Sequence, residues 1–164
     1  MENPVENVKN SAAAGLPERK GGQTVLFGEH SCNIDEKNRL SIPARFREEL
    51  GEEFIITRWL DKCLIVLPKT KLDYIEQSLM NKGMVEGRDV SLFLYSGLAV
   101  VTPDKLGRVV LTAPLRKHAR LVKEAVVIGV GAYAEIWDPE EWERKQEEDL
   151  SGLPIRESMK ELNF

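Results

Sequence analysis

An internal repeat constrains the fold of this chain more than any other feature of the sequence. Residues 35–47 align with residues 104–116, 69 positions later, with Asp, Arg, Ala and Arg at four equivalent positions. Residues 54–57 and 64–68 align in turn with residues 125–128 and 135–139, 71 positions later. Each copy holds about four short strands, too few to cover its own sheet edges. We therefore expect two copies of one unit that cover each other.

Apolar spacing predicts the elements within a copy. In the first copy we expect a strand over 25–34, a turn at 35–38, a strand over 39–42 and further strands at 54–57 and 63–67. Pro43 and Gly51 delimit a short helix over 44–50. Helical spacing returns over 69–82 and 86–96, between the copies. Phe46 and its counterpart Leu115 are expected in the core, and Trp137 with Trp142 against a C-terminal helix.

These elements predict a mainly β fold with helices, in which the repeats form a pseudo-dimer within one chain. We expect an N-terminal arm over 1–24, a first repeat over 25–71, a helical linker over 72–97, a second repeat over 98–141 and a C-terminal helix or tail over 142–164. The arm lacks any apolar period and is predicted to be disordered. A pseudo-twofold axis would present the two Asp-x-x-x-Arg loops as a matched pair, the way twofold proteins meet a DNA duplex.

The charge is unevenly distributed. The net charge of −4 disfavours nucleic acid at first sight, but residues 104–123 hold six bases against one acid. Residues 138–161 hold nine acids against four bases, and this excess of acids is larger than the net negative charge of the whole chain. A basic face on an acidic body is therefore possible. The longest apolar runs are too short for a membrane helix or a signal peptide, so we expect a cytoplasmic protein without a membrane partner.

The paired loops are the candidate DNA-binding site. Arg39 and Arg108 carry planar, permanently charged groups that can bind a phosphate or the edge of guanine, and Lys37 and Lys105 offer point charges to the DNA backbone. For each arginine the alternative is a surface ion pair, worth roughly 0–1 kcal/mol. The residues expected to shape the loops are Asp35, Asn38, Asp104 and Gly107. A second tier of basic residues, suited equally to solvated faces and subunit contacts, is Arg45, Arg47, Arg116 and Arg120.

The sequence offers little for catalysis. His30 and His118 have no carboxylate or cysteine at a catalytic or metal-binding spacing, and no glycine-rich phosphate loop follows a strand. We expect no enzymatic activity, no cofactor and no metal.

With both loops in view, the sequence resembles the MraZ family, the tandem member of the AbrB/MazE group of transcription factors. The resemblance rests on Phe-Gly-Glu-His at 27–30, the two Asp-x-x-x-Arg loops, Ile-Pro-x-x-x-Arg at 42–47, and Gly-Val-Gly followed by Glu-Ile-Trp within 129–137. Asn38 stands where the family loop usually has Gly, and Thr112 where it usually has Pro. Asn tolerates a positive φ better than most residues, so the first loop can still form.

The resemblance implies a double-split, swapped-hairpin β-barrel made of two SpoVT-AbrB-like repeats and assembled into rings of identical subunits. It also implies residence on the nucleoid and control of the operon for cell division and cell-wall synthesis through short repeats of double-stranded DNA upstream of it. Two alternatives stay open: a ring-forming structural or interaction protein, and an antitoxin of the MazE kind, which normally has one copy and a long tail.

Overall fold

A computed structural model describes residues 25–163, and the predicted N-terminal arm over 1–24 lies outside them. The first repeat contains strands β1 (Glu29–Asn33), β2 (Arg39–Ser41), β3 (Phe54–Arg58) and β4 (Leu64–Pro68) and helix α2 (Ala44–Leu50). The second contains β5 (Ala99–Val101), β6 (Arg108–Val110), β7 (Glu124–Gly129) and β8 (Ala134–Trp137) and helix α5 (Ala113–Ala119). Helices α3 (Leu72–Lys82) and α4 (Arg88–Gly97) connect the repeats, and α6 (Pro139–Glu148) and α7 (Leu153–Met159) follow them. Short 3-10 turns occupy Leu60–Lys62 and Lys69–Lys71.

The two repeats exchange their first strands. β1 of the first repeat pairs with β7 of the second, and β5 of the second pairs with β3 of the first. The hairpins β3–β4 and β7–β8 meet through β4 and β8, which gives an antiparallel sheet with the order β1-β7-β8-β4-β3-β5. This exchange confirms the predicted swapped-hairpin fold of two tandem repeats.

A second, two-stranded sheet crosses between the repeats. β2 pairs with β6 in antiparallel register, with Leu40 opposite Val109, and a bridge between Ile34 and Leu40 joins this ribbon to the end of β1. Leu40 and Val109 are equivalent in the two copies, so the pseudo-twofold axis passes between them. Within residues 25–163, β1 and β5 stay at the two ends of the larger sheet, which makes the arrangement a split one.

One apolar core fills the space between the sheet and the ribbon. Phe46 of α2 and Leu115 of α5, fully buried as predicted, pack in the same cluster as the inward residues of the ribbon and the sheet. The core thus draws equally on both copies, because neither copy has a second layer of its own to bury this surface.

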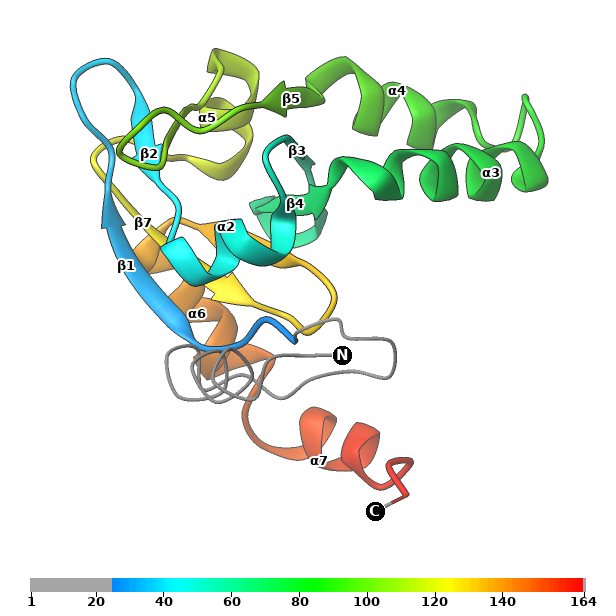
Figure 1. Ribbon diagram of the computed structural model, residues 1–164. Helices are drawn as coiled ribbons and strands as arrows, with labels where there is room; N and C mark the ends of the chain where they lie inside the picture. Colours follow the sequence, from blue (N-terminus) through cyan, green and yellow to red (C-terminus); the bar gives the residue numbers. More distant parts are fainter. Residues whose placement is uncertain (1–24, 164) are drawn as a thin grey trace, which may run out of the picture.

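The connecting helices project from the sheet. Figure 1 shows α3 and α4 as a hairpin that extends away from the strands. The hairpin is attached at the end of α4, where the buried Thr57 hydroxyl donates to the Leu94 carbonyl at 2.5 Å and Arg58 Nε donates to the Phe93 carbonyl at 3.0 Å. The Arg58 guanidinium also lies over the Phe93 ring, 5.1 Å from its centroid. Side chains of β3 therefore bind carbonyl groups near the C-terminal end of α4.

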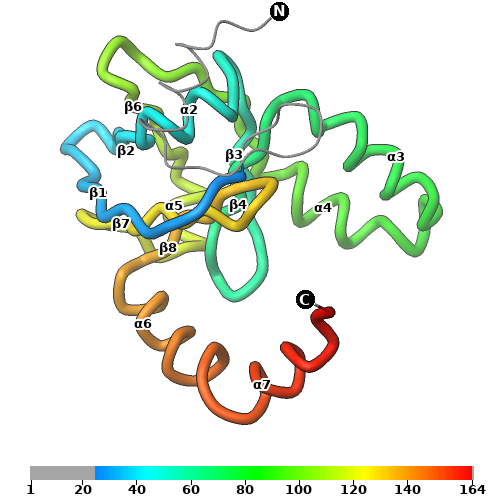
Figure 2. Tube along the Cα trace, turned by 60° about the horizontal axis from the view of Figure 1, so that its bottom comes forward, coloured from blue at the N-terminus to red at the C-terminus, as the bar shows by residue number. Residues whose placement is uncertain are grey.

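The C-terminal region differs from its predicted bounds. α6 begins at Pro139, inside the segment assigned to the second repeat, and a separate helix α7 follows. Asp138 caps α6 by accepting the N–H groups of Glu140 and Glu141. Trp142 of α6 packs on Trp137 with ring centroids 5.4 Å apart, as the sequence predicts. Figure 2 shows α6 and α7 on the side of the strands opposite the β2–β6 ribbon.

Candidate nucleic-acid interface

The two Asp-x-x-x-Arg loops are built by the same set of hydrogen bonds. In the first, Asp35 Oδ1 accepts the backbone N–H groups of Lys37 and Arg39, each at 2.9 Å. In the second, Asp104 Oδ1 accepts those of Leu106 and Arg108, each at 2.9 Å. The other carboxylate oxygen accepts the arginine Nε–H, at 2.7 Å from Arg39 and 2.9 Å from Arg108. Each aspartate thereby fixes the turn and aims the arginine four residues later.

Positive φ angles close both turns. Asn38 has a φ of 61° and Gly107, its counterpart, a φ of 79°. The N–H of Asn38 donates to the Asp35 carbonyl and that of Gly107 to the Asp104 carbonyl, both at 2.9 Å. Asn therefore adopts the conformation that Gly adopts in the second loop, in line with its tolerance of left-handed backbone.

The loops are joined across the pseudo-twofold axis. The N–H of Ile42 donates to the Gly107 carbonyl at 3.0 Å, and the N–H of Leu111 donates to the Asn38 carbonyl at 2.9 Å. Ile42 and Leu111 are equivalent residues, as are Gly107 and Asn38, so the two bonds are a reciprocal pair. Arg108 Nη1 also lies 3.8 Å from Asp35 Oδ2 of the other loop. The loops thus form one unit and not two separate turns.

Both arginines lie on the outer face of the β2–β6 ribbon. Leu40 and Val109 point into the core, so strand alternation places their neighbours on the opposite face. The register sets Arg39 opposite Val110 and Ser41 opposite Arg108. Within residues 25–163, the only side-chain hydrogen bond of each arginine is the one from its Nε–H, and 27 % of each side chain is exposed. The terminal amino groups can therefore reach a ligand while the ion pair holds the guanidinium in place.

The loop geometry also affects the pKa of both aspartates. The backbone N–H groups of Arg39 and Arg108 contribute most to holding the pKa of Asp35 and Asp104 below the ordinary carboxyl value, and the arginine side chains add to this effect. Both carboxylates therefore stay charged and keep the arginines oriented at neutral pH.

The second-tier arginines have structural partners. Arg47 Nε donates to the Ile42 carbonyl at 3.0 Å, and the equivalent Arg116 donates to the equivalent Leu111 carbonyl. Arg45 contacts His30 Nε2 at 2.7 Å, and burial followed by the Arg45 charge lowers the pKa of His30. Arg120 Nη1 is 2.9 Å from Glu141 of α6. Arg47 and Arg116 thus each bind a carbonyl group just beyond the end of a strand.

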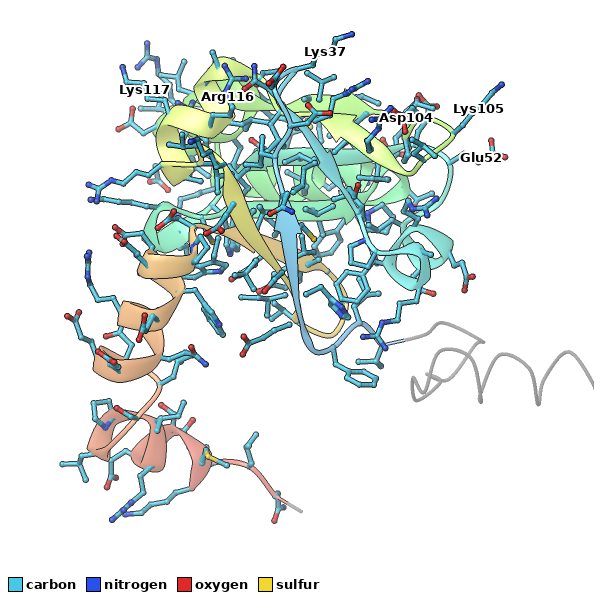
Figure 3. All side chains as sticks on the ribbon, turned by 90° about the vertical axis from the view of Figure 1, so that its left-hand side faces the viewer. Lys37, Glu52, Asp104, Lys105, Arg116 and Lys117 are labelled. Carbon is cyan, nitrogen blue, oxygen red and sulfur yellow. The ribbon has the colours of Figure 1, made fainter. Side chains whose placement is uncertain are left out.

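The lysines lie on one edge of the molecule. Figure 3 shows Lys105 with Glu52 at one end of the upper edge, Arg116 and Lys117 at the other end, and Lys37 between them. Lys37, Lys105 and Lys117 are exposed. Lys117 was not among the predicted site residues, and neither were Ser41 and Val110, which lie on the outer face of the ribbon. The signal for the latter two was present, because alternation around buried Leu40 and Val109 places them beside the arginines.

Other possible sites lie away from the loops. A cavity of about 440 Å³ is lined by aromatic side chains and by Cys63 and Glu135, and none of its lining residues belongs to either loop. Among residues 25–163, no group of three His, Cys, Asp or Glu side chains is arranged to hold a metal ion. None of the described helices is both long and apolar enough to span a membrane.

Comparison with known proteins places the chain in a family. The family described as "MraZ protein, putative antitoxin-like" matches residues 25–89 and 94–162, one block for each repeat with its following helices. The chain belongs to the MraZ family. Relatives in this family include "Transcriptional regulator MraZ" of Alkaliphilus oremlandii, 42 % identical over 143 residues, which covers 85 % of this chain and 100 % of the relative.

Two further MraZ relatives align with this chain over nearly the same length. The "Transcriptional regulator MraZ" of Pelotomaculum thermopropionicum is 41 % identical over 143 residues, covering 85 % of this chain and 99 % of the relative. The "Transcriptional regulator MraZ" of Clostridium tetani is 37 % identical over 142 residues, and the alignment covers 85 % of this chain and 100 % of the relative. MraZ membership confirms the predicted family, and it confirms the prediction of a transcriptional regulator and not an enzyme.

Proposed function

We propose that this chain regulates transcription by sequence-specific binding of double-stranded DNA through its paired Asp-x-x-x-Arg loops. The observation that carries the proposal is the pair of arginines on the outer face of the β2–β6 ribbon, each oriented by its own aspartate. A two-stranded ribbon fits the major groove of B-DNA. The ribbon would therefore bring both guanidinium groups to base edges at once.

The side chains of the loops divide into two roles. Arg39 and Arg108 have the planar donor geometry that pairs with O6 and N7 of guanine, and we assign them to base contacts. Lys37 and Lys105 are exposed beside them, and we assign them to phosphates. Ser41 and Val110 share the outer face with the arginines and complete the surface that meets the groove.

The proposed target follows from the family resemblance. We propose that the chain binds short repeats upstream of the operon for division and cell-wall synthesis, and that it acts in the cytoplasm on the nucleoid. The names of the relatives, which are transcriptional regulators, support the general role. The choice of operon rests on the resemblance alone.

We also propose that the chain assembles with itself into a ring. The α3–α4 hairpin exposes large apolar side chains that the rest of the described chain leaves uncovered, and a second copy would bury them. Those most exposed are Tyr74 at 70 %, Met80 at 71 %, Val85 at 89 % and Met84 at 94 %. Mass measurement by multi-angle light scattering is expected to give a closed oligomer, and a monomer at every concentration would contradict it.

The DNA proposal is tested by fluorescence anisotropy with labelled duplex from upstream of the gene and a scrambled duplex of equal composition. Titrations at several salt concentrations are expected to show selective binding to the upstream duplex that weakens steeply as salt rises. Equal and weak binding to both duplexes would reject the proposal. It would favour the two alternatives, a ring-forming interaction protein or a MazE-like antitoxin, and co-purification of a protein partner would then separate these.

A further inference from the structure

The two segments that begin with the short helices beside the loops carry opposite net charges. The first window, residues 44–54 with α2 at its start, holds Arg45 and Arg47 against four glutamates, a net charge of −2. The equivalent window is residues 113–125, because residue 54 aligns with residue 125, and α5 lies at its start. It holds one acid, Glu124, and its bases are Arg116, Lys117, Arg120 and Lys123, a net charge of +3. We call these segments the α2 flank and the α5 flank. The fold is pseudo-symmetric in backbone but polarised in charge.

Ion pairs with other elements do not remove the difference in net charge between the two flanks. Lys69 pairs with Glu53 of the α2 flank at 3.2 Å, and Glu141 pairs with Arg120 of the α5 flank at 2.9 Å. Counting these partners, the α2 flank has a net charge of −1 and the α5 flank +2. Lys117 and Lys123 are exposed, and neither side chain has an ion-pair partner among the described residues. Glu48, the counterpart of Lys117, is also exposed.

The strand exchange places each flank beside the loop of the other repeat. The N–H of Leu111, just before α5, donates to the carbonyl of Asn38 in the first loop. The backbone carbonyl of Lys123 accepts the N–H of Ile34, at the start of that loop, at 2.8 Å. On the other side, an added Cβ at Gly107 would lie 2.5 Å from Arg47 Cζ, which shows how closely α2 packs on the second loop. Figure 3 shows the result: Lys37 lies toward Arg116 and Lys117, whereas Lys105 lies toward Glu52.

Charge of this pattern acts differently on the two ends of a bound duplex. DNA that crosses the ribbon continues past both flanks, and its phosphates carry the same charge in both directions. The α5 flank attracts them and releases counterions, whereas the exposed glutamates of the α2 flank repel them. We propose that the face holds DNA unequally: Lys117 and the rest of the α5 flank bind phosphates, and the α2 flank does not. This inference rests on the proposed function.

Unequal binding gives the bound DNA a direction. The first loop with the α5 flank forms a half that contacts bases and has phosphate contacts from both loop and flank. The second loop with the α2 flank forms a half that contacts bases and whose only phosphate contact comes from Lys105 of the loop. The preferred DNA element is then not a palindrome, although the protein fold has pseudo-twofold symmetry, because the two halves of the element meet different surfaces.

Matched substitutions at Lys117 and Glu48 test the inference by anisotropy on the upstream duplex across a range of salt. Lys117→Ala removes one phosphate contact, so the slope of log affinity against log salt should fall in magnitude by about 0.9, with a roughly fivefold loss of affinity at 0.15 M salt. Glu48→Ala, at the equivalent exposed helix position, should cause no loss. Glu48→Lys should strengthen binding and steepen the slope, a gain that misfolding cannot produce.

The outcomes separate this inference from the function on which it rests. Wild-type protein that fails to select the upstream duplex overturns both. Selective binding that depends on Arg39 and Arg108, with an unchanged slope for Lys117→Ala or equal losses for Lys117→Ala and Glu48→Ala, overturns the unequal binding alone. Loss with Lys117→Ala together with a gain for Glu48→Lys supports it.

Discussion

Asn38 and Gly107 occupy equivalent positions in the two loops. Both have a positive φ, a conformation that glycine adopts freely and asparagine tolerates. Gly107 also lies against the guanidinium of Arg47 on the opposite helix. A side chain at position 107 would therefore meet both the positive φ and this guanidinium.

Substitution at these two positions is expected to have unequal effects. Gly107→Ala places a Cβ at positive φ and 2.5 Å from Arg47 Cζ, so the free energy of unfolding should fall by about 1–3 kcal/mol. Asn38→Gly relieves the backbone and should change it by less than about 1 kcal/mol. Urea denaturation measures both, and equal destabilisation by the two variants would contradict the account.

Asp35 and Asp104 make loop stability depend on pH. Their pKa values in the folded chain lie below the ordinary value of 3.8, because backbone N–H groups stabilise the charged form. Their contribution is thus present above the pKa of the unfolded chain and is lost as pH falls through the lower folded value. Urea denaturation between pH 7 and pH 3 should show the double variant Asp35→Asn, Asp104→Asn less stable than wild type at neutral pH. The difference should shrink below pH 3.8, and one that stays constant down to pH 3 would refute this linkage.

At the scale of elements, the sequence predicted what depends on local pattern. The helix over 44–50 follows from Pro43 and Gly51, and the ribbon strands follow from alternation around Leu40 and Val109. The strand predicted over 25–34 is shorter, Glu29–Asn33, because Gly28 adopts a φ of 89° and Leu26 makes only an isolated bridge to Gly131. The polarity of the flanks could have been read from equivalent residues such as Glu48 and Lys117, but their positions beside the loops required the strand exchange.

Contacts between distant elements could not be predicted in this way. Thr57 reads in the sequence as an ordinary strand residue, yet its hydroxyl is buried and binds the end of α4, 37 positions away. Arg47 and Arg116 read as surface charges, yet they bind carbonyls at the ends of strands. Such contacts depend on which backbone groups the fold leaves unpaired, and sequence periodicity carries no record of that.

The attachment of the α3–α4 hairpin can be tested at Thr57. Thr57→Val keeps the shape of the side chain but leaves the buried Leu94 carbonyl without its donor, so the free energy of unfolding should fall by about 1–3 kcal/mol. Hydrogen exchange should also become faster in α4. Thr57→Ser retains the hydroxyl and is the control; losses as large for Ser as for Val would show that the methyl group, and not the hydrogen bond, holds the helix.

For the whole molecule, the exchange of strands makes the two repeats interdependent. β1 has its sheet partner in β7, β5 in β3 and β2 in β6, each in the other repeat. The core is likewise shared, with Phe46 and Leu115 in one cluster. Neither repeat can bury its apolar face alone, so the chain should fold as one cooperative unit.

Separate production of residues 25–97 and 98–163 tests this dependence. Each fragment alone, studied as a monomer at low concentration, should lack a cooperative thermal transition by circular dichroism. An equimolar mixture should regain the β-sheet signal and a transition, because the fragments supply each other's missing strands. A fragment that unfolds cooperatively as a monomer would show that the repeats are independent domains.

The central claim is that the two repeats present one DNA-binding face through Arg39 and Arg108. The most direct measurement is the affinity of the double variant Arg39→Ala, Arg108→Ala for the upstream duplex, compared with Arg88→Ala on the projecting hairpin (Figure 1). Arg88 is 69 % exposed and lies outside both loops. Loss of each base contact should cost about 1–3 kcal/mol, so the double variant should bind at least tenfold more weakly and select less well against the scrambled duplex, with Arg88→Ala unchanged. A folded double variant that binds and selects as wild type does would contradict the account.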